Sequence, residues 1–213
     1  IQLNIRLRTT KEGKASNEKA KKLNVGDPRV WPFIFVSSLF SITQAIIFQT
    51  MGFFIYDQLG YSTNDAAIYV SICFGIWSVS VVLTQTFINP LFKSLKVMMV
   101  LGPILSAISF ITLIFSDEIF ALVGTLVLNG IGLGITRPSY NSALSLSHEK
   151  QFQSSAAGIM GSTLPIGHMI APIFVSLYLV NFSYVYIFST IICIVSIAFT
   201  LLHPYILKSN AYK

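Results

Sequence analysis

The sequence predicts an all-α membrane protein built from six transmembrane helices, and three observations carry this prediction. The chain is 54% apolar and 10% charged, with a mean hydropathy of +0.71, whereas a soluble domain is about 25% charged. Uncharged runs of about 20 apolar residues recur, which suits helices that cross a bilayer rather than the ~10-residue alternating strands of a barrel. Finally, a six-span arrangement places every Lys and Arg on one side of the membrane.

Short polar turns separate the predicted helices, and a polar, basic lead precedes them. This lead, residues 1–29, lacks the apolar core of a signal peptide. The chain starts at Ile1 and its first Met is Met51, so we expect other sequence to precede Ile1. We predict a cytoplasmic linker at 1–29, a six-helix bundle at 30–206 and a cytoplasmic tail at 207–213. The predicted spans are 31–56, 66–88, 97–115, 119–136, 154–180 and 184–203.

The basic residues determine the predicted orientation of the chain. Eight of the 14 lie in the lead, and two lie in each of the second loop, the fourth loop and the tail. Because cytoplasmic loops are enriched in Lys and Arg, both ends are expected in the cytoplasm. The cytoplasmic loop residues of interest are Lys93, Lys96 and Arg137. The net charge of +6 therefore indicates orientation and not nucleic-acid binding.

The fifth predicted span gathers small residues, prolines and a histidine on one face. At about 100° per residue, six positions fall within a sector of roughly 80°. They are Ser154, Gly158, Gly161, Pro165, His168 and Pro172. Small residues let another helix approach closely. The two prolines leave the carbonyls of Gly161 and His168 without helical donors, so these groups need other partners.

His168 lies near the middle of this span, where a titratable side chain is costly and is a candidate for function. It is expected either to contact substrate or to relay a proton. The alternative is a kinked packing helix in which a neighbouring group satisfies the histidine.

Polar side chains in three other spans predict a central cavity. One face of the first span carries three of them, the second carries a line of them, and Asn129 lies near the centre of the fourth. The same residue types also hold helices together by hydrogen bonds, so packing remains the alternative. The candidate cavity residues are Ser37, Ser41, Gln44, Ser78, Gln85, Asn129 and His168. The candidate kink and packing residues are Gly130, Gly134, Gly158, Gly161, Pro165 and Pro172.

Three stretches carry a resemblance to a known family. GIGLGITRPSYNSALSLSHEKQFQSSAAGIMGSTLPIGHMIAPI runs from a glycine-rich helix through a loop into a Gly/Pro-rich helix, and IYDQLGYSTNDAA is typical of an outer turn. Phe74, Gly75 and Gln85, followed by NPLFKSLK, look like a degenerate copy of a basic loop motif. Together they resemble the C-terminal half of a major facilitator superfamily transporter, and are most similar to drug:proton antiporters of the tetracycline-efflux type. Two departures stand out: Ser94-Leu95-Lys96 replaces the usual Gly and Arg pair, and the spans contain no deep carboxylate.

The resemblance implies one half of a twelve-helix fold, built of two inverted three-helix repeats. The expected partners are an N-terminal six-helix half, the lipid bilayer and a small-molecule substrate. It also implies a plasma membrane location, such as a bacterial inner membrane. The expected function is proton-coupled efflux of small lipophilic compounds or drugs by alternating access. No cofactor and no metal are expected, and a proton gradient is the expected energy source.

Three other functions remain open at this point. One is an uptake carrier of the same fold for a sugar or metabolite. Another is a membrane-embedded enzyme that uses Ser162 and His168. Six residues of helix separate these side chains by roughly 120° and about 9 Å, too far for a nucleophile–base hydrogen bond, so we expect no enzyme. The third is a scaffold protein, which would not need polar groups at the midplane.

Overall fold

The computed structural model describes residues 23–204 and 206, and their regular elements are helical. Six of these helices are long and apolar enough to cross a membrane. This confirms the predicted fold class. A π-helical turn at Thr84–Ile88 and a 3-10 turn at Asn89–Leu91 extend the second helix. The six helices are α1 (Trp31–Asp57), α2 (Thr63–Leu83), α3 (Leu95–Ile114), α4 (Ile119–Leu146), α5 (Gln153–Val180) and α6 (Phe182–Leu202).

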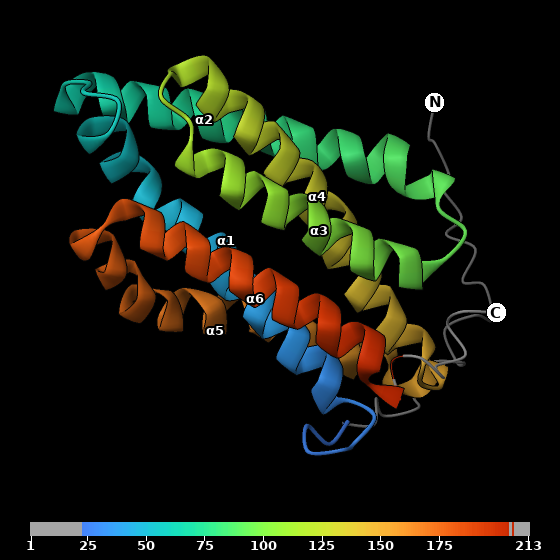
Figure 1. Ribbon diagram of the computed structural model, residues 1–213. Helices are drawn as coiled ribbons and strands as arrows, with labels where there is room; N and C mark the ends of the chain where they lie inside the picture. The colour runs from blue at the N-terminus through green and yellow to red at the C-terminus, as the bar shows by residue number, and fades with distance from the viewer. Residues whose placement is uncertain (1–22, 205, 207–213) are drawn as a thin grey trace, which may run out of the picture.

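The six helices form two groups, and each group combines helices from both halves of the chain (Figure 1). α1 packs with α5 and α6, whereas α4 packs with α2 and α3. Extensive contact between α3 and α6 joins the two groups. The first helix of each three-helix repeat therefore packs on the second and third helices of the other repeat. Two inverted repeats would produce this arrangement.

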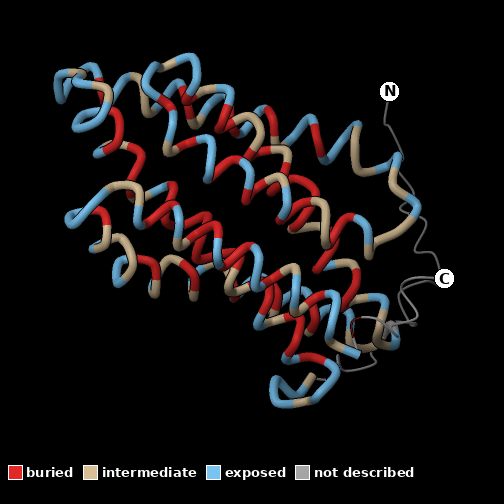
Figure 2. The backbone as a smooth tube through the Cα atoms, in the orientation of Figure 1, coloured by how far each residue is buried: buried red, intermediate tan, exposed pale blue. Residues whose placement is uncertain are grey.

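Burial differs sharply among the helices (Figure 2). The most apolar 18-residue window of α1 is 67% buried, and the corresponding windows of α2 and α5 are 22% buried. α1 contacts α2, α4, α5 and α6, so it occupies the centre of the bundle. α2 and α5 lie at its flanks and leave much of their surface uncovered.

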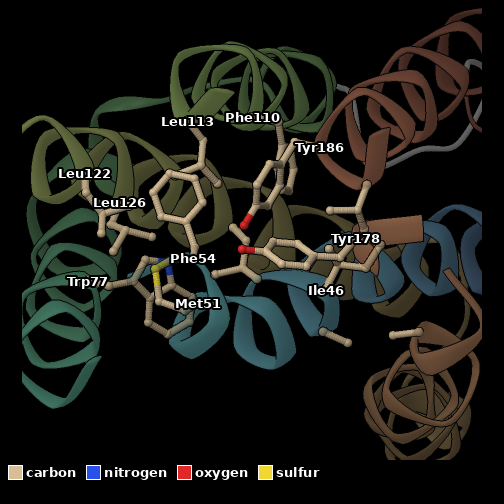
Figure 3. Packing of buried hydrophobic residues seen from close by; sticks show 14 of the residues in the cluster. Ile46, Met51, Phe54, Trp77, Phe110, Leu113, Leu122, Leu126, Tyr178 and Tyr186 are labelled. Atoms are coloured by element: carbon tan, nitrogen blue, oxygen red, sulfur yellow. The ribbon is translucent and has the colours of Figure 1, made fainter. Parts of the chain in front are cut away.

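Aromatic packing around the C-terminal half of α1 forms the main core (Figure 3). Phe54 and Met51 of α1 belong to one buried cluster with Trp77 of α2, Phe110 of α3 and Tyr186 of α6. The Tyr186 hydroxyl donates to Thr50 Oγ1 at 3.2 Å, so the phenol is buried with a hydrogen-bond partner. Leu122 and Leu126 of α4 and Tyr178 of α5 belong to the same cluster, so it joins all six helices.

Glycines on α4 let neighbouring helices approach on two opposite sides. A Cβ added at Gly130 would lie 2.9 Å from the Trp77 carbonyl oxygen of α2. A Cβ at Gly132 would lie 2.9 Å from the Gly102 carbonyl oxygen of α3. Gly134 lies against Thr84 and Val81 in the same way. α4 is therefore held tightly between α2 and α3.

Three of the four internal prolines in the described helices are compensated by side chains from other parts of the chain. Pro103, Pro138 and Pro172 each lack the N–H that would bond the carbonyl four residues earlier. Those carbonyls belong to Met99, Gly134 and His168. They accept hydrogen bonds from Tyr140 Oη at 3.2 Å, Asn89 Nδ2 at 2.9 Å and Gln49 Nε2 at 3.4 Å, respectively. Each of these three prolines is thus tolerated because another part of the chain supplies the missing donor.

The bounds of two helices differ from the predicted spans by three residues or more. α4 continues through Pro138 to Leu146, ten residues beyond the predicted end at Thr136. The Arg-Pro pair suggested a loop, but Asn89 caps the carbonyl that Pro138 leaves free, so the helix goes on. α2 begins at Thr63, three residues early, because Ser62 Oγ accepts a hydrogen bond from the Asp65 amide and caps the helix.

Other parts of the predicted division stay predictions. Residues 1–22 and 207–213, which include most of the linker and the tail, lie outside the described residues. α5 is one continuous helix through Pro165 and Pro172. Lys93 lies between the turn at Asn89–Leu91 and α3, and Lys96 lies in the first turn of α3.

Candidate substrate cavity

A cavity of about 360 Å³ lies among α1, α4 and α5, with one wall from α2. This volume is within the range of small-molecule sites, roughly 300–1,000 Å³. Its lining combines polar side chains with aromatic and aliphatic ones. The lining residues are Ser37, Phe40, Ser41, Gln44, Phe48, Trp77, Leu133, Thr136, Arg137, Tyr140, Leu164 and His168.

The polar row of α1 lies in this cavity. Ser37, Ser41 and Gln44 follow each other at steps of four and three, so they share a face of the helix. α5 lies very close to α1 beside this row. A Cβ added at Gly167 of α5 would be 2.5 Å from the Ser41 carbonyl carbon of α1. The Ser37 and Thr163 hydroxyls, 3.0 Å apart, share a hydrogen bond across the same contact. The α1–α5 contact thus forms one wall of the site.

Gln44 is the most unusual group of the cavity. Its side chain is 3% exposed, and neither Oε1 nor Nε2 has a hydrogen-bond partner among the described residues. An unsatisfied buried polar group costs about 1–3 kcal/mol, so such groups are rare without a functional reason. A primary amide can both donate and accept. Gln44 therefore offers both kinds of hydrogen bond to a molecule in the cavity.

His168 enters the cavity from α5 and is half-buried. Its ring centroid lies 6.0 Å from that of Phe48, and the ring makes no hydrogen bond with the described residues. The carbonyl of His168 is the one that Pro172 frees, and Gln49 of α1 donates to it. The carbonyl thus finds the partner that the sequence analysis required, while the imidazole remains available to the cavity.

Asn129 acts on the cavity only through Trp77. The Trp77 indole Nε1 donates to Asn129 Oδ1 at 3.2 Å, and Asn129 is fully buried between α2 and α4. Trp77 lines the cavity and meets the Phe48 ring edge-on at 5.1 Å. Asn129 therefore positions an aromatic wall rather than lining the site. Its Nδ2 has no partner among the described residues.

Ser78 and Gln85 lie outside this cavity. Both are exposed on α2 and on its π-helical extension. The buried side of that segment belongs instead to Cys73, Trp77 and Ser80, and Ser80 Oγ donates to the Val127 carbonyl of α4 at 2.9 Å. The polar line of α2 is therefore turned away from α4.

Arg137 is the cavity residue that sequence reasoning placed wrongly. It was expected in a cytoplasmic loop, but it lies on α4, nine residues before the end of the helix, and lines the cavity. The misjudged Pro138 is the cause, because it suggested that the helix had ended. Trp77, Thr136 and Tyr140 were also missed, and only a helical period continued through Pro138 would have indicated Tyr140.

The predicted packing residues fall into two groups. Gly130 and Gly134 make the close contacts with α2 described above. Gly158 and Gly161 have no atom within 4 Å of an added Cβ, and Pro165 and Pro172 are exposed. No described residue packs directly on Gly158 or Gly161, and Gly161 instead faces a pocket that α4 also lines.

Comparison with known families agrees with this architecture. A family model of the Major Facilitator Superfamily matches residues 74–211, well over half of the chain. The chain belongs to the Major Facilitator Superfamily. A search of curated proteins finds no match. Members of this superfamily are secondary transporters rather than enzymes, so membership indicates a multi-pass membrane protein with a role in transport.

Proposed function

We propose that this chain is the C-terminal half of a proton-coupled exporter of small lipophilic molecules, which bind in the cavity among α1, α4 and α5. The observation that carries the proposal is Gln44, a buried amide without protein partners in a cavity of about 360 Å³. Alternating access would expose this site to each side of the membrane in turn. A proton gradient would supply the energy, and no cofactor is required.

The composition of the cavity wall favours lipophilic substrates over sugars. The surface of the wall is mainly apolar, and Phe40, Phe48, Trp77, Leu133 and Leu164 contribute to it. A sugar would need many hydrogen-bond partners at once, because each buried hydroxyl without one is costly. Export of lipophilic compounds therefore suits this site better than uptake of a sugar.

The uncovered flanks of the bundle support a second six-helix half as partner. α2 and α5 expose polar and small residues along faces that no described helix covers. A half-transporter would meet its partner half through such faces. We further propose that both ends of this chain are cytoplasmic, as the distribution of Lys and Arg predicts, and that the membrane is the plasma membrane, as the family resemblance implies.

His168 is the proposed proton-relay or substrate-contact residue. It is a titratable side chain in a cavity-lining position near the middle of α5. The relay would run toward an acidic group in the partner half. Gln at this position keeps hydrogen bonding and similar bulk but cannot titrate. In His168→Gln, proton-driven efflux should fall steeply while substrate exchange survives if His168 relays protons.

The test is efflux of a panel of neutral, anionic and cationic lipophilic dyes from energised vesicles that contain the full-length protein. We expect wild-type efflux to stop when a protonophore collapses the gradient. Gln44→Leu, which keeps the bulk and removes the amide, should lower efflux about tenfold or more, the effect of losing one hydrogen bond to a buried ligand group. Ser78→Ala, outside the cavity, is the matched control. The proposal fails if no dye is exported, or if Gln44→Leu and Ser78→Ala behave alike.

A further inference from the structure

Arg137 is the one charged residue in the interior of the six described helices. The other charges on these helices are Asp57, Asp65 and Lys96, which lie in their first or last turns. Arg137 lies nine residues from the end of α4, about 14 Å along the helix axis. A charge in such a place is costly to keep and calls for a counter-charge or a water-filled cavity.

The described part of the chain supplies no counter-charge to Arg137. Its guanidinium makes no ion pair and no hydrogen bond with any described residue. The cavity that it lines contains no Asp or Glu. The hydroxyl-bearing residues of the same lining, Ser37, Thr136 and Tyr140, are neutral. The positive charge is therefore uncompensated within this cavity.

Aromatic side chains form the other wall. The Phe48 ring stacks on Phe74 at 4.7 Å and meets Trp77 edge-on at 5.1 Å. Phe48 and Trp77 line the cavity with His168, and Asn129 holds the indole of Trp77 in place. Such a wall suits a flat apolar or aromatic body, because aromatic rings pack well against one another.

We propose that the cavity selects organic anions with an aromatic body, with the carboxylate against Arg137 and the ring against Phe48 and Trp77. This rests on the proposed transport function of the same cavity and names its substrate class. Arg is suited to this role because its planar fork of donors matches a carboxylate in a bidentate pair. The Gln44 amide is neutral, so it would bind a polar substituent of an anionic molecule and of a neutral molecule alike. The charge preference would come from Arg137 alone.

The alternative is that Arg137 pairs with a carboxylate that another part of the protein provides. A permanently paired Arg137 would present no net charge to a ligand. The cavity would then take neutral molecules at least as well as anions. The two possibilities thus differ in one measurable quantity, the preference for an anion over a neutral molecule of the same shape.

The experiment measures equilibrium binding of radiolabelled 2-naphthoate and of its neutral isostere 2-naphthamide to the full-length protein in lipid nanodiscs. We expect naphthoate to bind about tenfold or more tightly than naphthamide, as one charge-assisted pair would give. Arg137→Gln should remove this preference, and Arg137→Lys should retain part of it, because Lys keeps the charge but not the fork. Gln44→Leu and Ser78→Ala both leave Arg137 in place, so both variants should retain the preference for naphthoate.

Several outcomes would overturn the inference. They are equal affinity for the two probes, tighter binding of the amide, no binding of either, or a preference that survives in Arg137→Gln. Arg137→Lys keeps the test valid if Arg137→Gln does not fold. The proposed function is judged separately: Gln44-dependent efflux of neutral or cationic dyes alone would support a transporter and contradict the anion preference.

Discussion

The two sides of α5 differ more than the sequence of this helix suggests. On the side toward α1, Thr163 and Gly167 are buried, and Gly167 lies almost against the Ser41 backbone. On the other side, Gly158 and Gly161 are exposed, and no atom lies within 4 Å of a Cβ added at either position. Both sides carry small residues at helical spacing. Small residues therefore identify surfaces where a helix can come close, but not which surface a given helix uses.

The pairing of α5 with α1 follows from hydrogen bonds as much as from size. Thr163 bonds Ser37, and Gln49 caps the carbonyl that Pro172 leaves free. On the opposite side, Ser162 Oγ donates only to the Ile159 carbonyl of its own helix. The side with cross-helix polar partners is the side that packs within this chain.

The largest expected effect is in a pair of glycine substitutions on α5. In Gly167→Ala, the new Cβ would overlap the Ser41 backbone, so we expect a loss of about 1–3 kcal/mol from overpacking. In Gly161→Ala the Cβ has free space, and higher helix propensity should leave stability unchanged or raise it by up to about 1 kcal/mol. The measurement is the temperature at which half of the monodisperse protein is lost in detergent. A larger loss in Gly161→Ala than in Gly167→Ala would contradict the pairing of α5 with α1.

A smaller effect is expected for adjacent hydroxyl residues on the two sides. Thr163→Val keeps the shape of the side chain but leaves the buried Ser37 hydroxyl without its partner, which should cost about 1–2 kcal/mol. Ser162→Ala removes an exposed, self-bonded hydroxyl and should stay within about 0.5 kcal/mol of wild type. The same melting measurement compares them. If both variants have the same melting temperature, the Ser37–Thr163 hydrogen bond does not hold α5 against α1.

Hydropathy and charge were sufficient to predict the fold, because burial in a bilayer demands long uncharged helices whose period is easy to read. The polar row of Ser37, Ser41 and Gln44 was also predictable, since three polar side chains on one face of a central helix need a polar environment. Ser78 and Gln85 show the same pattern but are exposed on α2. Sequence period alone could not distinguish a cavity from an uncovered flank, because it does not say which helix is central.

The position of Arg137 in the cavity lining also could not be predicted, and the reason is different. A proline normally ends a helix or kinks it, and whether it does depends on the carbonyl that it frees. For Pro138 that carbonyl belongs to Gly134, and its donor is Asn89, 45 residues earlier in the chain. The sequence around Pro138 does not indicate this contact, because the donor lies far away in the chain. The cavity lining therefore depends on tertiary hydrogen bonds that only the structure reveals.

The central claim is that substrate binds between α1 and the inner side of α5. The most direct test places cysteines on both sides of α5 in the full-length protein and measures thiol labelling with and without a compound that the protein exports. The native Cys73 and Cys193 are buried, which keeps the background low. Leu164→Cys lines the cavity, and Gly158→Cys lies on the other side. The account predicts that the compound slows labelling at Leu164→Cys and leaves Gly158→Cys unchanged. Protection at Gly158→Cys with none at Leu164→Cys would contradict it.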